Sequence, residues 1–76
     1  MESETLIRMA NQIAMFWAPY PEAEAIHSVR DHLEKFWDPA MRKTLVSIAN
    51  GLVPSAQTLH PLVVRAVHDM QRSEHE

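Results

Sequence analysis

The sequence predicts an all-α fold, a small bundle of about four helices arranged as two helical hairpins and without a sheet. Five prolines, at positions 19, 21, 39, 54 and 61, fall between blocks of apolar residues and not inside them. Within each block apolar residues recur every three or four positions, as on one face of a helix, and no block alternates as a half-buried strand does. We therefore expect a single helical domain over 1–76.

The first expected helix covers about residues 4–17. Ser3 or Thr5 is expected to cap its start, and the prolines at 19 and 21 end it. At about 100° per residue, its large apolar side chains fall within one arc of about 100°. This stripe consists of Leu6, Met9, Ile13, Phe16 and Trp17.

The second expected helix covers about residues 22–36 and has a stripe with the same spacing. Its members are Ile26, Val29, Leu33, Phe36 and Trp37. Polar positions do not match between the two segments, which favours two stripes of one length over a duplication. Each Phe-Trp pair lies on the stripe at a helix end. Either both indoles belong mainly to the core, or at least one is exposed for a partner.

The third expected helix covers about residues 39–50. Asp38 is a good N-cap, Pro39 suits the first helical position, and Gly51 can close the helix in the left-handed conformation. Its stripe is Met41, Leu45, Ile48 and Leu52. A loop over 53–59 leads to a fourth helix over about 61–71. The stripe of that helix is Leu62, Val63, Ala66, Val67 and Met70, and the polar tail 72–76 is expected to fray.

Composition excludes several classes of function. The net charge is −3, and no basic run exceeds Arg42-Lys43, so the basic face that nucleic-acid binding needs is missing. No segment approaches the roughly 20 apolar residues of a membrane span, and the first residues lack the order of a signal peptide. We expect a soluble, cytoplasmic chain that binds neither nucleic acid nor membrane.

The residues that could carry catalysis or bind a metal lack the necessary spacing. There is no cysteine, and neither His27 with His32 nor His60 with His68 has the i, i+4 spacing of a helical zinc site. One glycine cannot make a phosphate-binding loop, and no serine lies in an activating motif. We expect no catalytic, cofactor-binding or metal-binding residue in this chain.

Two polar positions suggest partner binding. The Asn11-Gln12 pair lies mid-helix and off the apolar stripe, where a solvated face or a partner contact accounts for it. Arg42, one turn after a capping Asp-Pro, could lie on the surface or reach a carboxylate on a partner. With the two indoles, the candidate partner-binding residues are Asn11, Gln12, Trp17, Trp37, Asp38, Pro39 and Arg42.

Three segments resemble a known family. They are LIRMANQIAMFW at 6–17, PEAEAIHSVRDHLEKFWDPAMR at 21–42 and LHPLVVRAV at 59–67. In order and spacing they are similar to the delta subunit of the soluble NAD-dependent formate dehydrogenases. Two positions depart from the family pattern. Ala40 stands where arginine is common, and His60 stands where serine is common, which implies a weaker cap on the last helix.

The resemblance implies a role inside an enzyme complex that oxidises formate to carbon dioxide and reduces NAD. In this family the large alpha subunit carries a molybdenum or tungsten pterin and iron–sulfur clusters. Beta and gamma subunits carry flavin (FMN), further clusters and the NAD site. Delta has no cofactor and is implied to support assembly or stability, most plausibly by docking on alpha near its pterin region. The alternative is a free-standing helical interaction or regulatory module, including a homodimer of the isolated chain.

Overall fold

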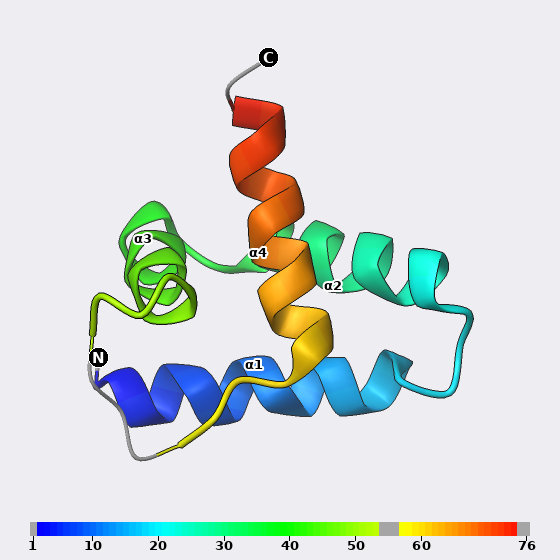
Figure 1. Ribbon diagram of the computed structural model, residues 1–76, viewed down its shortest axis with the longest axis horizontal. Coiled ribbons are helices and arrows are strands. Elements are labelled where there is room, and N and C mark those ends of the chain that lie inside the picture. Colours follow the sequence, from blue (N-terminus) through cyan, green and yellow to red (C-terminus); the bar gives the residue numbers. More distant parts are fainter. Residues whose placement is uncertain (1, 54–56, 75–76) are drawn as a thin grey trace.

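A computed structural model describes residues 2–53 and 57–74, and these residues form four helices with no strand between them. The four helices are α1 (Ser3–Trp17), α2 (Glu22–Phe36), α3 (Pro39–Ala49) and α4 (Pro61–Glu74) (Figure 1). The all-α prediction is therefore confirmed.

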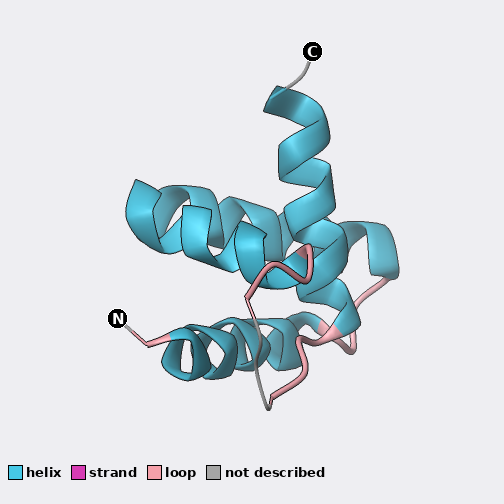
Figure 2. Cartoon of the chain, turned by 60° about the vertical axis from the view of Figure 1, so that its left-hand side comes forward, coloured by secondary structure: helices cyan, strands magenta, loops and turns pink. Residues whose placement is uncertain are grey.

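The helices pack as an antiparallel pair crossed by a third helix. α1 and α2 run side by side in opposite directions, and α4 crosses them, with its most extensive contacts on α2 (Figures 1 and 2). α3 packs against α1 and α4 at the end of the pair where α1 begins. The whole measures 30 × 29 × 21 Å. α4 therefore holds together elements that are distant in the sequence.

The corner between α2 and α3 is held by two side chains that bond backbone groups, one at the end of α2 and one at the start of α3. Asp38 Oδ1 accepts a hydrogen bond from Met41 N at 2.9 Å, and Pro39 occupies the first helical position, as predicted. Arg42 Nη1 donates to the carbonyl oxygens of Trp37 at 2.7 Å and of Glu34 at 2.9 Å. Glu34 is in the last turn of α2 and Trp37 is its C-cap residue, and carbonyls at a helix end lack intrahelical donors. Arg42 thus joins the end of one helix to the start of the next.

α3 ends in the left-handed cap that Gly51 predicts. Gly51 has a φ of +76°. Its N–H bonds Ile48 O at 3.1 Å, and Leu52 N bonds Ser47 O at 2.9 Å, which is the Schellman pattern. The helix itself stops at Ala49. Leu52 therefore lies beyond the helix and is 74% exposed, so its predicted place on the apolar stripe of α3 is wrong.

The predicted caps of the first and last helices need correction. Glu2 precedes α1 without a side-chain cap bond, so neither Ser3 nor Thr5 caps it. Before α4, His60 Nδ1 accepts a hydrogen bond from Leu62 N at 3.0 Å, so the ring does the work of the serine that is common there.

α4 also runs past its predicted end. It reaches Glu74, where the sequence predicted an end at residue 71. Arg72 in its last turn bonds Asp69 at 2.6 Å, which favours continuation of the helix because a cation near a helix C-terminus is stabilising. Residues 75 and 76 of the predicted frayed tail lie outside the described residues.

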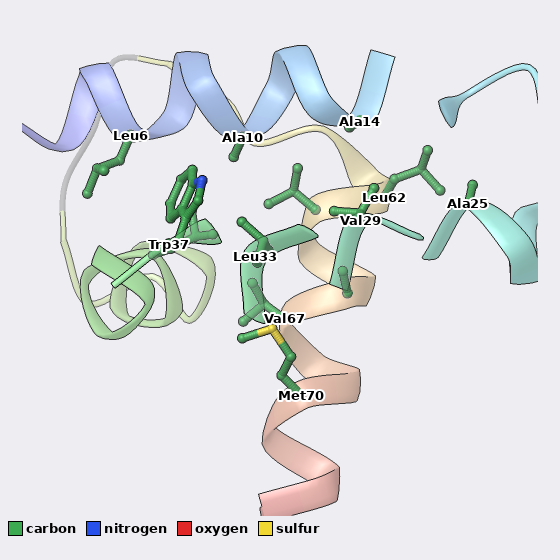
Figure 3. Close-up of a cluster of buried hydrophobic side chains, with 13 residues drawn as sticks. Leu6, Ala10, Ala14, Ala25, Val29, Leu33, Trp37, Leu62, Val67 and Met70 are labelled. Carbon is green, nitrogen blue, oxygen red and sulfur yellow. The ribbon is translucent and has the colours of Figure 1, made fainter. Parts of the chain in front are cut away.

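The core lies where α1, α2 and α4 meet (Figure 3). Four of its fully buried residues are alanines, Ala10 and Ala14 on α1, Ala25 on α2 and Ala66 on α4. Small side chains allow two helix backbones to approach closely, which leaves no room for a large side chain between them. The large side chains next to the alanines therefore lie at the edges of the contact.

Two of the predicted core residues are exposed as a result. Phe16 is 66% exposed and Phe36 is 73% exposed, although the sequence placed both on the stripes that face the core. Met9 and Ile13 are only partly buried. The buried face of α1 instead consists of Leu6, Ile7, Ala10 and Ala14. The predicted stripe of α1 is thus partly wrong, because the buried face is turned away from Phe16.

Candidate functional site

An open groove runs between α1 and α2, beside the alanine contact, and we call it the aromatic groove. Its volume is about 520 Å³. Its seven lining residues are Met9, Gln12, Ile13, Phe16, Trp17, His32 and Trp37. Five come from α1, which turns its second apolar face toward this space because its alanines already occupy the core. The groove is therefore an apolar surface that the chain itself leaves uncovered.

Ring contacts extend the aromatic groove at both ends. Trp17 stacks at a tilt on Tyr20, with ring centroids 4.9 Å apart, and meets the edge of Phe16 at 5.2 Å. On the other side His32 contacts Phe36, with centroids 4.8 Å apart. Aromatic pairs at these distances hold one another in place. A partner would therefore meet a largely preformed surface.

The aromatic groove carries no formal charge when its histidine is neutral. None of its seven lining residues is Asp, Glu, Lys or Arg, although the chain has 17 such residues, 7 basic and 10 acidic. The polar groups in the lining are the Gln12 amide, the His32 ring and the two indole N–H groups. Depletion of charge and enrichment in aromatic residues and Met are the compositional marks of the centre of a protein interface.

The two indoles occupy different environments. Trp37 is only 5% exposed and lies beneath α1 beside Leu6, with its nitrogen on the α1 side (Figure 3). Trp17 is partly buried and packs against the edge of the core. Both side chains line the aromatic groove. In each Phe-Trp pair the tryptophan is therefore more buried than the phenylalanine.

Asn11 is engaged within the chain. Its Nδ2 donates to Thr58 O at 2.9 Å, and its Oδ1 accepts from His60 N at 2.8 Å. The side chain thereby ties the segment before α4 to the middle of α1. The neighbouring Gln12 is exposed and lines the aromatic groove. One residue of the predicted pair therefore has a structural role, and the other faces the groove.

The remaining candidates lie at the corner between α2 and α3. Asp38, Pro39 and Arg42 serve the caps described above. Of the seven predicted partner-binding residues, the structure brings Gln12, Trp17 and Trp37 into the aromatic groove, and it places the other four elsewhere. Their partner contacts stay a prediction, because a single chain does not test them.

Sequence reasoning missed four groove residues and two that flank the groove. Met9, Ile13 and Phe16 were assigned to the core stripe, and His32 was considered only as a metal ligand. Tyr20 and Phe36 extend the groove without lining it. The available signal was the Ala10–Ala14 pair, four residues apart, which marks a close-packed face of α1. Had that face been taken as the core, the Met9–Ile13–Phe16 face would have been expected outside it.

A charged cluster joins α2 to α4 away from the aromatic groove. Arg30 Nη1 bonds Asp69 Oδ2 at 2.7 Å, Arg30 Nε bonds Glu34 at 2.9 Å, and Arg72 bonds Asp69 at 2.6 Å. Hydrogen bonds from Arg30 and then Arg72 hold the pKa of Asp69 below its usual value. Because these charged groups pair with one another, we interpret the cluster as a link between α2 and α4.

The described residues offer neither a metal site nor a membrane segment. Over 2–53 and 57–74 no group of three or more His, Cys, Asp or Glu side chains could hold a metal ion. In the same part of the chain no helix combines the length and the apolar character needed to cross a membrane.

Comparison with known proteins identifies the family. The family model of the NADH-dependent formate dehydrogenase delta subunit, FdsD, matches residues 5–67. No curated protein and no solved structure was found to match. The family match covers both helices that form the aromatic groove and continues into α4. The chain belongs to the family of delta subunits of NADH-dependent formate dehydrogenases.

Proposed function

We propose that this chain is a non-catalytic accessory subunit of a soluble NAD-dependent formate dehydrogenase. It supports assembly or stability of the complex by docking on the large catalytic alpha subunit through the aromatic groove. In this proposal the molybdenum or tungsten pterin, the iron–sulfur clusters and FMN belong to the other subunits. The observation that carries the proposal is the uncharged aromatic groove on a chain that belongs to the delta family.

The groove has the properties of an interface centre. Its exposed Phe16 and the flanking Phe36 are large apolar side chains that gain free energy when a partner covers them, roughly 1.5–3 kcal/mol for each fully buried side chain. The indoles of Trp17 and Trp37 also line the groove, and tryptophan is enriched among residues that dominate binding energy. The helix pair presents these side chains on a rigid support.

Docking supports assembly through mass action. A subunit that binds the assembled, cofactor-loaded state of the alpha subunit more tightly than the unassembled state shifts the equilibrium toward assembly. The size of the shift is limited by the difference between the two affinities. A chain with no chemistry of its own can therefore raise the yield of active enzyme.

The first test deletes the chain from the organism that makes the complex. We expect a lower yield of intact complex and a lower pterin-metal content per alpha subunit. Gel filtration, metal analysis and formate-dependent NAD reduction measure these quantities. Full metal content, stability and turnover without delta would show that the assembly role is wrong.

The second test removes the aromatic surface. We expect the double variant Phe16→Ser with Phe36→Ser to co-purify poorly with the other subunits. The matched control is Leu52→Ser, because Leu52 is as exposed as Phe36 but is not among the groove-lining residues. Equal co-purification of the two variants would assign docking to another surface. A chain that pairs with itself and not with the enzyme would favour the free-standing, homodimeric alternative.

A further inference from the structure

We infer that the aromatic groove receives an apolar polypeptide segment of the larger subunit that brings an uncharged oxygen, a backbone carbonyl, to the indole N–H of Trp37. This inference deepens the proposed docking function and rests on it. It assigns a specific recognition contact to one atom of the groove.

The indole N–H of Trp37 has no acceptor within the described part of the chain. The hydrogen bonds of Trp37 among the described residues use its backbone: its N–H donates to Leu33 O at 3.2 Å, and its carbonyl oxygen accepts from Arg42 Nη1 at 2.7 Å. An indole N–H is a donor only, so it cannot be satisfied by a donor nearby. Tryptophan side chains that are buried usually find a partner for this group. The donor of Trp37 is therefore unpaired in a side chain that is about 95% buried.

This donor is open to the groove. Every buried side-chain nitrogen or oxygen of the described residues has a partner, so an unpaired indole nitrogen must still reach solvent. Trp37 lines the aromatic groove, and its nitrogen lies on the side of α1, the helix that supplies five of the lining residues (Figure 3). We therefore assign the indole N–H of Trp37 to the surface of the aromatic groove.

When a partner docks, the indole N–H of Trp37 determines which segments can bind. A partner that covers Phe16 and the groove also removes water from the indole N–H. Leaving the donor without an acceptor would weaken binding, because a buried unpaired polar group loses its bonds to water. The segment that fits must therefore present an acceptor at this position, between apolar contacts to Met9 and Ile13.

The acceptor is uncharged. The groove lining contains no arginine or lysine, so a carboxylate buried there would lack a permanent counter-charge. A neutral oxygen carries no such penalty. Backbone carbonyls inside a helix are already bonded, whereas the last four of a helix are free. The C-terminal turn of an apolar helix therefore supplies both requirements, and Gln12 can bond a second free group beside it.

The test replaces one atom of the indole. A chain of 76 residues is accessible to chemical synthesis, and 3-benzothienylalanine at position 37 exchanges the N–H group for sulfur while keeping the ring shape. The matched control carries the same analogue at Trp17, whose ring lines the groove but is less buried. Affinity is measured for the formate dehydrogenase complex purified from a strain that lacks delta.

We expect the position-37 analogue to fold with an unchanged thermal midpoint, because the N–H group has no partner among residues 2–53 and 57–74. Its affinity for the complex should fall about 5- to 30-fold, whereas the position-17 analogue should lose less than about 3-fold. Equal affinity of the natural chain and the position-37 analogue would overturn the inference. Failure of the natural chain to bind would instead overturn the proposed docking function.

A second measurement does not depend on any variant. In the natural chain the indole proton of Trp37 should exchange with solvent readily when the chain is free. It should exchange at least tenfold more slowly in the complex, because a bonded and covered proton is protected. An indole proton of Trp37 that exchanges equally fast in both states would contradict the inference, even if the synthetic analogue folded poorly.

Discussion

The Asn11 side chain supplies the hydrogen-bond partners of two backbone groups that lie outside the helices. Its amide offers one donor and one acceptor to Thr58 and His60, which lie 47 and 49 residues away in the chain. These two bonds tie residues just before α4 to the middle of α1. A polar residue in the middle of an amphipathic helix is explained here by closure of the chain.

We predict that Asn11→Ala lowers the free energy of unfolding by about 1–3 kcal/mol, because the replacement leaves two backbone groups without their partner. Urea unfolding followed by circular dichroism measures the change. Gln12→Ala is the control and should stay within about 0.5 kcal/mol, because Gln12 is exposed. Equal effects of the two substitutions would show that the Asn11 bonds contribute nothing to stability.

The ring of His60 performs the capping task that serine performs in the family pattern. Its Nδ1 accepts from Leu62 N, the first free donor of α4 after Pro61. We predict that His60→Ala costs about 1 kcal/mol of stability, while His60→Ser retains most of it. Thermal unfolding of the two variants decides this. A serine variant as unstable as the alanine variant would mean that the ring contributes by packing.

Between elements, the bond from Arg30 to Asp69 links α2 with α4 and makes stability depend on pH. The pKa of Asp69 is lower in the folded chain than its ordinary value of 3.8. Its contribution to stability is therefore complete above that ordinary value and is lost as the pH falls through the lower pKa of the folded state.

We predict that the free energy of unfolding falls between roughly pH 5 and pH 2, and that Asp69→Asn flattens this decline. Urea titrations across that range provide the measurement. Asp31→Asn is the matched control, because the Asp31–Lys35 pair joins residues of one helix at the surface, with side chains 47% and 65% exposed. The same slope in wild type and Asp69→Asn would exclude this link as a source of acid sensitivity.

The boundaries marked by proline or glycine could be predicted from the sequence, whereas the faces that the helices bury could not. Pro39 and Gly51 act through their own backbone geometry, so they fix where α3 starts and ends in any surroundings. Which face of α1 is buried depends on how closely α2 and α4 approach it, a property of the assembled bundle. Phe16 satisfies the helical period and is nevertheless exposed for that reason.

At the scale of the whole molecule, the aromatic groove shows how much of the site the sequence contained. The indoles and Gln12 could be identified as candidates because their residue types are unusual at these positions. Met9 and Ile13 could not, because apolar residues at helical spacing look alike in a core and in an interface. The N-cap of Asp38 on α3 could be predicted from its place before Pro39, whereas the bonds of Arg42 to carbonyls at the end of α2 could not, because they form only when the corner is folded.

The exposed aromatics should be dispensable for the isolated chain. We predict that Phe16→Ser with Phe36→Ser changes its free energy of unfolding by less than about 1 kcal/mol, because both side chains are already mostly hydrated. Leu33→Ala, at a fully buried position, should cost about 2–5 kcal/mol. Denaturant unfolding compares them. A serine pair as damaging as Leu33→Ala would place both phenylalanines in the core after all.

The direction of α4 has a practical use. The helix leaves α1 and ends on the opposite side of the molecule from it (Figure 1). Because the sequence has no cysteine, a single Ser73→Cys replacement near that end gives one attachment point for a fluorescent dye. The dye would sit away from α1 and would report the tumbling of the chain without touching what docks there. Fluorescence anisotropy at that position could then follow capture by the enzyme in real time.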